Sequence, residues 1–427
     1  MTTQTCPDWF KLDNAAKIFP AVDSPTTTTM FRVSATLDEP IDRDVLARAH
    51  ADLAERFPYL RVTLKAGLFW HYLQRVDEVG VVSEERDPPC RTIDARNSRA
   101  LLFKVLYFGR KISAEFSHIV TDGAGALAYL RALVAQYFKH LGVETDDTSD
   151  LLLPGEDIDP EEYEDSYKTF YDPGIPLPPD QEHAYQLPDP IVDPHAVRVI
   201  TGITPVAPLL ELARATGVSL TEYFVALYLF VLYEHLQSVP PELRRRQLRP
   251  IRLVVPVNLR KQFPSKTMRN FLLHVTPGID LRLGRFTFDE VVDKVHHYMR
   301  VELNEKLLKQ QIARNMRGET NPLIRVTPLF LKIPFERVLY NKYGNAIASG
   351  VLSNLGSVKM PPILDEHVER IEFITVPNPD TKVSVGVISH RDQLYTTFGS
   401  LIQSREIERR FFTGLRTRGV PVKIETN

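Results

Sequence analysis

Residues 116–126 read FSHIVTDGAGA, and this stretch decides how the rest of the chain is interpreted. A strand-like apolar run ends in His118, Asp122 and Gly123 follow shortly after, and a helix-like pattern begins behind them. Three interpretations are open: a packed histidine beside an ordinary turn, a glycine-rich nucleotide loop, or a catalytic base held in place by its neighbours.

The strand before the turn places the histidine. Successive side chains of a strand point to opposite faces, so His118 continues the face set by its apolar neighbours Ile112, Ala114 and Phe116. The imidazole is therefore expected inside the fold, at a strand end. An inward histidine is commonly a hydrogen-bonded core residue. Near neutral pH, one that a substrate can reach can also take a proton from a hydroxyl or an amine.

The residues after the histidine fit more than one role. Asp122 can cap the free amides at the start of a helix, and Gly123 can relieve strain at a sharp strand-to-helix turn. The run GAGALA at 123–128 also fits the G-x-G-x-x-A pattern of dinucleotide-binding loops. That interpretation is the weaker one, because the helix leads into an acidic stretch and the preceding strands pair as hairpins.

Periodicity along the chain predicts an α+β protein with mixed sheets. A carboxylate-rich and then proline-rich stretch, residues 144–190, is expected to be a solvated crossover between two halves. Hairpins outnumber clean βαβ units, which argues against a doubly wound parallel sheet. The first half is predicted to contain a strand at 30–37, a helix at 42–57, hairpins at 60–76 and 101–118, and a helix at 124–140. In the second half we expect helices at 206–216, 219–236, 289–317 and 406–416, and strands at 251–257, 347–352, 371–376, 383–389 and 394–398.

Length and composition limit the function classes. A chain of 427 residues suggests two or three units, and 43% hydrophobic with 25% charged residues is ordinary for a globular protein. The net charge of −2 gives no support for nucleic-acid binding. Two cysteines, Cys6 and Cys90, cannot make a disulfide framework, so a cytoplasmic location is expected.

Other sites and membrane segments find little support. The longest apolar run, Tyr223–Tyr233, is too short to span a bilayer, and no face is obviously directed to a membrane. The sequence has no G-x-S-x-G elbow and no phosphate-binding P-loop. His296 and His297 lie on one predicted helix, where neighbouring side chains diverge, so no metal site is predicted.

The segment His118–Gly123 resembles the HxxxDG motif of the coenzyme-A-dependent acyltransferases. This superfamily shares the chloramphenicol acetyltransferase-like fold and includes alcohol acetyltransferases and condensation domains. Val255–Arg260 resembles its strand that ends in an arginine, and Met268–Phe271 its downstream turn with an asparagine. Ser353–Gly356, SNLG, resembles a segment of the alcohol acetyltransferase branch. The resemblance covers most of the chain and is closest to bacterial alcohol acetyltransferases.

The resemblance implies a complete set of expectations about fold and substrates. Two chloramphenicol-acetyltransferase-like subdomains, 1–180 and 181–427, would each have a mixed sheet with flanking helices, and an active-site channel would lie at their interface. Acetyl-CoA or another acyl-CoA would be the co-substrate, with no tightly bound cofactor. The acceptor would be a small-molecule alcohol.

The resemblance also implies roles for individual residues. His118 would be the general base, Asp122 a structural partner of Arg260, and Gly123 the turn residue. Ser353 or Asn354 would stabilise the oxyanion or bind substrate. No covalent acyl-enzyme is implied.

Two alternatives keep the fold. One is condensation-type acyl or amide transfer with a carrier-protein donor or an amine acceptor, and the other is a binding module with a degenerate site. Ser117 stands where condensation domains usually have a second histidine, and the DFGWG segment of plant acyltransferases is not visible. Both differences favour stand-alone acetyl transfer. The sequence leaves the acceptor, the acyl length, the residues that bind coenzyme A and the oligomeric state open.

Overall fold

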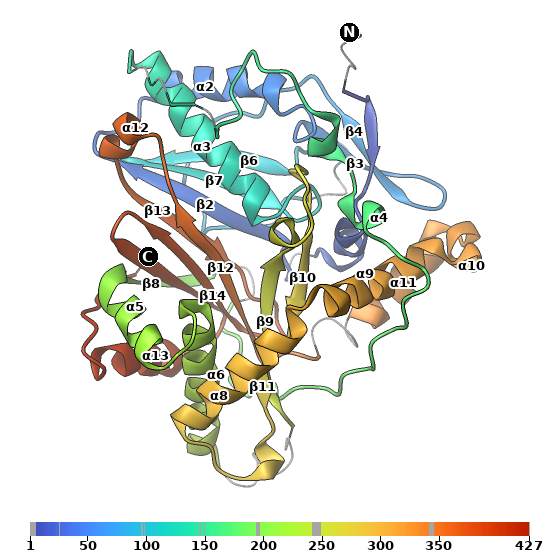
Figure 1. Cartoon of the computed structure of the whole chain (residues 1–427). Helices are drawn as coiled ribbons and strands as arrows, with labels where there is room; N and C mark the ends of the chain where they lie inside the picture. The colour runs from blue at the N-terminus through green and yellow to red at the C-terminus, as the bar shows by residue number, and fades with distance from the viewer. Residues whose placement is uncertain are drawn as a thin grey trace.

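The computed structural model describes residues 6–426 except 25, 95, 96, 98, 144, 146, 149, 194–196, 241–248 and 341–345. Two large sheets with flanking helices form the body of the molecule, and a small sheet lies beside the first of them (Figure 1). Parallel and antiparallel pairs occur together, which confirms the predicted α+β class with mixed sheets.

The first large sheet carries the HxxxDG segment. Helices α2 (Arg43–Arg56) and α3 (Gly123–His140) pack against each other and, through α3, on this sheet. The Asp42 carboxylate caps α2 by accepting from the backbone amides of Asp44 and Val45, as expected of aspartate at a helix start. The strand order is β13 (Val368–Thr375), β2 (Met30–Leu37), β7 (Lys111–Ser117), β6 (Phe103–Phe108) and β5 (Ser83–Glu84).

The second large sheet comes from the C-terminal half, and helix α6 (Leu220–Ser238) supplies much of its core. The apolar side chains of α6 pack with those of α8 (Phe288–Glu302) and α13 (Glu406–Arg416), and α5 (Val206–Ala215) lies beside them. The strand order is β10 (Leu272–Val275), β9 (Ile251–Asn258), β12 (Gly350–Val358), β14 (Val383–His390), β15 (Gln393–Ser400), β8 (Arg198–Pro205) and β16 (Lys423–Thr426), and β11 (Gly278–Ile279) pairs with β9.

Shorter elements complete the described chain. The small sheet has the order β1 (Trp9–Lys11), β4 (His71–Arg75) and β3 (Val62–Ala66). The short helices that precede the C-terminal half are η1 (Ala15–Ile18), α1 (Phe19–Val22), η2 (Pro160–Tyr163) and α4 (Ser166–Thr169). The remaining described helices of the C-terminal half are η3 (Leu259–Lys261), η4 (Leu281–Leu283), α9 (Glu305–Thr320), α10 (Pro322–Val326), α11 (Leu329–Tyr340) and α12 (Pro362–His367).

Strand β13 joins the two halves, because it belongs to the C-terminal half in sequence but pairs antiparallel with β2. It crosses β14 and β15 at close range, where two glycines leave room for its backbone. A Cβ atom at Gly386 would lie 2.6 Å from the carbonyl oxygen of Phe373, and one at Gly399 would lie 2.8 Å from that of Thr375. The first sheet therefore contains strands from both predicted units, 1–180 and 181–427. The two units are separate in sequence but share this sheet.

Both hairpins predicted in the first half are present, as β3–β4 and β6–β7. The single long helix predicted at 289–317 is wrong, because α8 ends at Glu302 and α9 starts at Glu305. Asn304 causes the break: its backbone is extended and its side chain accepts from the Lys306 amide, which caps the new helix.

The crossover between the halves differs from the predicted solvated linker. Glu162 is buried, and its carboxylate accepts from both terminal nitrogens of the Arg56 guanidinium at 2.7 and 2.8 Å. The Tyr59 hydroxyl donates to the same carboxylate at 2.7 Å. The backbone of the crossover also bonds to the loop after η3: Met268 donates to the Glu162 carbonyl oxygen and Thr267 to that of Glu164. The crossover around Glu162 is thus packed against both halves, while residues 171–183 include no buried residue and fit the predicted solvated linker.

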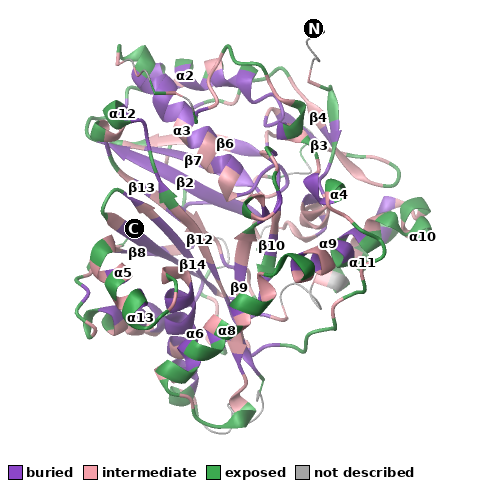
Figure 2. Cartoon of the chain, in the orientation of Figure 1, coloured by how far each residue is buried: buried purple, intermediate pink, exposed green. Residues whose placement is uncertain are grey.

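Among the described residues, no single helix has the length and apolar character needed to cross a membrane. Helices α5 and α6 pass that test only together, as a pair bent by 81°. The apolar residues of α6 lie in the core of the second sheet, and Figure 2 shows the strands as mostly buried or intermediate.

The close crossing of β13 predicts the effect of one methyl group. Gly386→Ala should lower the free energy of unfolding by about 1–3 kcal/mol, because the added carbon must push a backbone carbonyl away. The matched control is Gly318→Ala in α9, where nothing lies near the new methyl and a gain of about 0.5–1 kcal/mol is expected. Urea unfolding of both variants measures the difference, and equal stabilities would contradict the tight crossing.

Candidate active site

His118 lies just beyond the end of β7, between two aromatic rings. Its backbone amide donates to the Thr29 carbonyl oxygen at 3.0 Å, which fixes the start of the turn. The Phe31 ring centroid is 4.4 Å from that of the imidazole, and the Phe19 centroid is 5.5 Å away at an interplanar angle of 24°. The side chain is half-buried, and its ring packs against apolar neighbours as the strand alternation predicted.

The surroundings of His118 favour a neutral imidazole. Burial lowers the pKa of His118 because protein atoms solvate the cation less well than water does, and the nearby Asp122 carboxylate opposes this in part. Its Nδ1 atom is buried and has no hydrogen-bond partner among the described residues. A neutral imidazole near pH 7 has a free lone pair and can accept a proton.

The Asp122 carboxylate bonds in several directions at once. Oδ1 accepts from the backbone amides of Ala124 and Gly125 at 3.0 and 3.2 Å and caps α3. Oδ2 accepts from Arg260 Nη1 at 2.8 Å and from the Phe271 amide at 2.9 Å. The predicted contact between Asp122 and Arg260 is present. No hydrogen bond joins Asp122 to the His118 ring in the described part of the chain, so the arrangement differs from a protease triad.

Arg260 ties the end of β9 to the loop that follows it. Nε donates to the Thr267 carbonyl oxygen at 2.9 Å, and Nη2 donates to that of Arg269 at 2.6 Å. The guanidinium thus holds the loop closed while a third nitrogen reaches Asp122. This closure brings Asn270 and Phe271 against the HxxxDG turn.

The sequence interpretation missed a second link to His118, formed by Asn270 and Asp13. The Asn270 Nδ2 atom donates to the His118 carbonyl oxygen at 2.8 Å and to Asp13 Oδ2 at 3.1 Å. Asp13 is fully buried, and burial raises its pKa to about 6, although Arg269 at 3.6 Å acts in the opposite direction. Asn270 lies in the turn quoted for the resemblance, but nothing in the sequence singles out Asp13.

His274 is a further residue that the sequence did not indicate. It lies on β10, its side chain is exposed, and its register partner is Pro256 on β9. Burial by the surrounding protein lowers its pKa to about 4, with smaller contributions from positive charge on His118 and Arg314. His274 lies close enough to His118 for charge on the two rings to interact.

The predicted Ser353–Gly356 segment lies on β12, beside the start of α3. A Cβ atom at Gly123 would lie 2.5 Å from Leu355 Cδ2, so the glycine lets the two segments meet. Asn354 has both ends of its amide engaged: Nδ2 donates to the Thr221 hydroxyl and Oδ1 accepts from the Gly356 amide, each at 2.8 Å. The half-buried Ser353 hydroxyl is therefore the better candidate donor of the two.

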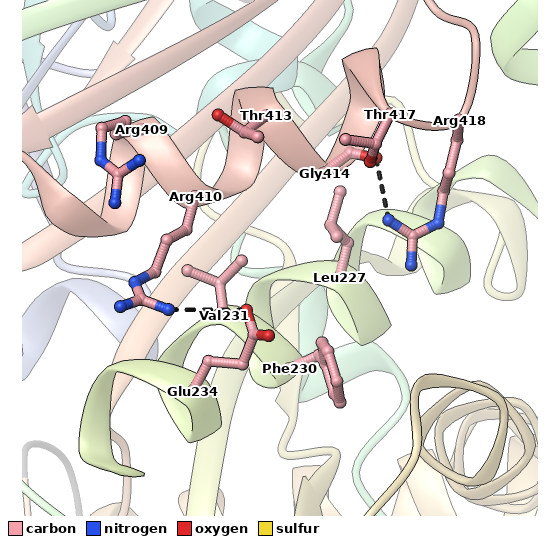
Figure 3. Close-up of a pocket in the computed structure, with 10 residues that line it drawn as sticks. All are labelled: Leu227, Phe230, Val231, Glu234, Arg409, Arg410, Thr413, Gly414, Thr417 and Arg418. Carbon is pink, nitrogen blue, oxygen red and sulfur yellow. Dashed lines mark hydrogen bonds and ion pairs between the residues drawn. The ribbon is translucent and has the colours of Figure 1, made fainter. Parts of the chain in front are cut away.

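A separate pocket lies between α6 and α13, and no predicted site residue lines it (Figure 3). Its volume is about 330 Å³. Of its cations, Arg409 pairs with Glu406, Arg410 lies near Glu234, and Arg418 lies over the Phe288 ring. Because these arginines already have partners, the pocket is not assigned a ligand.

Comparison with solved structures identifies the fold. F. sporotrichioides TRI101, solved with coenzyme A and T-2, has a TM-score of 0.62 at 13% identity, over 97% of this chain and 99% of that one. TRI3 trichothecene 15-O-acetyltransferase from Fusarium sporotrichioides gives 0.59 at 9%, over 98% and 96%. The starter condensation domain of rhizomide synthetase RzmA, solved with C8-CoA, gives 0.58 at 12%, over 96% and 94%.

The chain therefore has the fold of coenzyme-A-dependent acyltransferases and condensation domains, the chloramphenicol acetyltransferase-like fold. No protein-family model matches the sequence, and neither does any curated protein. At these identities the likeness establishes the fold and leaves the reaction to be argued from the residues.

The Asp122–Arg260 pair predicts energetic coupling across the two halves. Either Asp122→Asn or Arg260→Met alone should lower the unfolding free energy by about 2–4 kcal/mol. The first leaves the partly buried guanidinium without its anion, and the second leaves the buried carboxylate without its cation. The double variant should lose less than the sum, with a coupling of about 1–3 kcal/mol. The exposed pair Arg86–Glu84 is the control and should show coupling near zero. Additive losses at Asp122 and Arg260 would contradict the pairing.

Asp13 predicts an unusual dependence of stability on pH. A carboxyl whose pKa is raised on folding binds its proton more tightly in the folded state, so its stabilising effect is present below its unfolded pKa and is lost as the pH rises through about 6. The stability of the wild type relative to Asp13→Asn should fall by about 3 kcal/mol between acid and neutral pH. Urea unfolding at several pH values measures this slope, and a flat difference would contradict the raised pKa.

Proposed function

We propose that this protein is an O-acyltransferase, which moves an acyl group, acetyl in the simplest case, from a coenzyme A thioester to an alcohol. The observation that carries the proposal is the half-buried imidazole of His118, whose pKa is lowered by burial and whose turn is held by Asp122, Arg260 and Asn270. The fold shared with acyltransferases that bind coenzyme A supports the same class.

The proposed reaction uses His118 as the general base. The neutral imidazole takes the proton of the acceptor hydroxyl while the oxygen attacks the thioester carbonyl carbon, and the carbonyl oxygen becomes an oxyanion. Collapse of this tetrahedral intermediate breaks the carbon–sulfur bond, and the coenzyme A thiolate takes the proton back from the imidazolium. The products are an ester and free coenzyme A, and no acyl group is attached to the protein.

The other site residues act through position and charge. Asp122 and Arg260 are positioning residues, since they hold the turn and make no bond to the imidazole ring. The Ser353 hydroxyl is proposed to donate to the oxyanion, and the engaged amide of Asn354 to fix the strand that carries it. Gly123 keeps the turn close to Leu355. Coenzyme A would bind as a substrate only, and the two cysteines, both free, fit a cytoplasmic location.

Condensation-type transfer is the second candidate, favoured by the similarity to a condensation domain over nearly the whole chain. It differs in taking a carrier-protein-bound donor or an amine acceptor. A panel that crosses acyl-CoA and acyl-carrier donors with alcohols and amines separates the two. Turnover confined to the carrier donor or to amines would replace the proposed reaction. Coenzyme A binding without turnover on any acceptor would indicate a binding module.

Removal of the imidazole should abolish most of the activity. With acetyl-CoA and alcohols, His118→Ala should lower kcat/KM by roughly two to four powers of ten, as expected for loss of a general base. In the wild type, kcat/KM should rise with pH through an apparent pKa below the ordinary histidine value of 6.5, because burial lowers the pKa of His118. Release of free thiol from coenzyme A measures kcat/KM for the variant and for the wild type at each pH. His297→Ala on the exposed face of α8 is the control. Undiminished turnover in His118→Ala would exclude it as the base.

A further inference from the structure

Helix α11 buries a lysine and exposes most of its large apolar side chains. Lys332 is only 4% exposed, its Nζ atom donates to the Phe69 carbonyl oxygen at 2.9 Å, and it lies 3.4 Å from the centre of the Trp70 ring. Glu336 is partly buried and interacts with Lys332. An ordinary helix on a protein surface has the opposite arrangement, because its apolar side faces the core.

The outward side of α11 forms one continuous apolar surface. With about 100° per residue, Phe330, Leu331, Pro334, Phe335 and Val338 fall within roughly 140° of the helix circumference. The short helix α10, which precedes α11 in the chain, also has exposed apolar side chains. We call α10 and α11 together the apolar arm; its exposed large apolar side chains, with their exposed fractions, are Leu323 (76%), Val326 (66%), Phe330 (71%), Leu331 (55%), Phe335 (56%) and Val338 (63%).

The charges around this surface are of one sign. Arg325 and Arg337 are the exposed charged residues of the apolar arm, and Arg317 at the end of α9 is exposed as well. Glu336 is the only acidic residue in the sequences of α10 and α11, and it is partly buried and interacts with Lys332. An apolar surface with a positive border complements an anionic lipid surface.

We propose that the apolar arm docks on a membrane surface that contains anionic lipids, with its phenylalanine and leucine side chains inserted among the lipid chains. The shape supports this occupant: α10 and α11 project from the side of the molecule, and α10 is exposed along most of its length (Figures 1 and 2). Exposed apolar side chains on a projecting element can enter a deformable bilayer. Helix α11 has 12 residues, too few to cross a membrane, so the arm lies in the plane of the interface.

This proposal differs from the sequence interpretation, in which no face is obviously directed to a membrane. The charges of this part of the chain alternate with apolar residues in sequence, but folding turns Lys332 and Glu336 inward and leaves the apolar residues together outside. The direction of each side chain around the helix decides the character of the surface, and composition alone does not show it.

The apolar arm is connected to His118 through one short element. Helix α11 packs against α1, where Arg337 Nε donates to the Ala21 carbonyl oxygen at 2.6 Å. Phe19 at the start of α1 stacks on the His118 ring. If the proposed acyl transfer holds, on which this step rests, the acceptor is a lipophilic alcohol that reaches His118 from the bilayer.

The test is sedimentation of the full-length protein with vesicles of phosphatidylcholine alone or mixed with phosphatidylglycerol. The wild type should sediment with the mixed vesicles and much less with phosphatidylcholine alone. Phe330→Ser combined with Phe335→Ser should lower the partition constant about a hundredfold, since two aromatic side chains no longer enter the lipid. Arg325→Glu should lower it about tenfold.

The matched control combines Phe108→Ser with Val81→Ser, which removes two exposed apolar side chains (60% and 74%) outside the apolar arm. It should bind like the wild type. All these side chains are exposed, and unchanged urea unfolding curves show that the variants fold. Absence of binding to the mixed vesicles, or equal losses in the control, would overturn the proposal. The proposal would also be overturned if the wild type were a dimer in the absence of lipid and the Phe330 and Phe335 variant were a monomer. The apolar face would then serve self-association.

Activity assays keep the two proposals apart. Vesicle binding without acyl transfer leaves membrane docking in place and rejects the transferase. Acyl transfer to short water-soluble alcohols without vesicle binding supports the transferase and rejects membrane docking. If both hold, the Phe330 and Phe335 variant should lose activity only on a long-chain alcohol presented in vesicles.

Discussion

The carboxylate of Asp122 is the constraint on which the site depends. One oxygen caps helix α3 of the first unit, and the other receives the Arg260 guanidinium and the Phe271 amide from the second. A buried carboxylate is stable only when such donors surround it, so the two halves must meet with these groups in register. The turn that carries His118 lies directly before this junction. The position of the imidazole therefore follows from an ion pair that does not touch it.

The loop after η3 receives support from several distant parts of the chain. Arg260 closes it from within, and the crossover bonds to it through the backbone of Glu162 and Glu164. Glu162 is itself fixed by Arg56 on α2. Asn270 then bridges the loop to the His118 carbonyl oxygen and to the N-terminal segment through Asp13. Segments that are far apart in sequence thus converge on one turn, which leaves it little freedom to move.

The same fold supports acetyl transfer in one solved relative and forms a condensation domain in another, so the backbone does not select the reaction. In this chain the side chains around that frame include Ser117 before the histidine and His274 on β10, and the apolar arm lies outside it. The apolar arm is attached to the element that stacks on His118, so surface and site are parts of one continuous structure.

The sequence by itself determined the local features. Strand alternation placed His118 inside, hairpin spacing gave β3–β4 and β6–β7, and the resemblance paired Asp122 with Arg260. These depend on neighbouring residues or on a motif whose parts are known to meet. Only the tertiary structure showed that Asp13 reaches Asn270, that Glu162 is buried against Arg56, that β13 joins the first sheet, and that Lys332 points inward. Each of these is a contact between residues far apart in the chain, and such contacts leave no periodic signal, because they are set by how the sheets and helices pack.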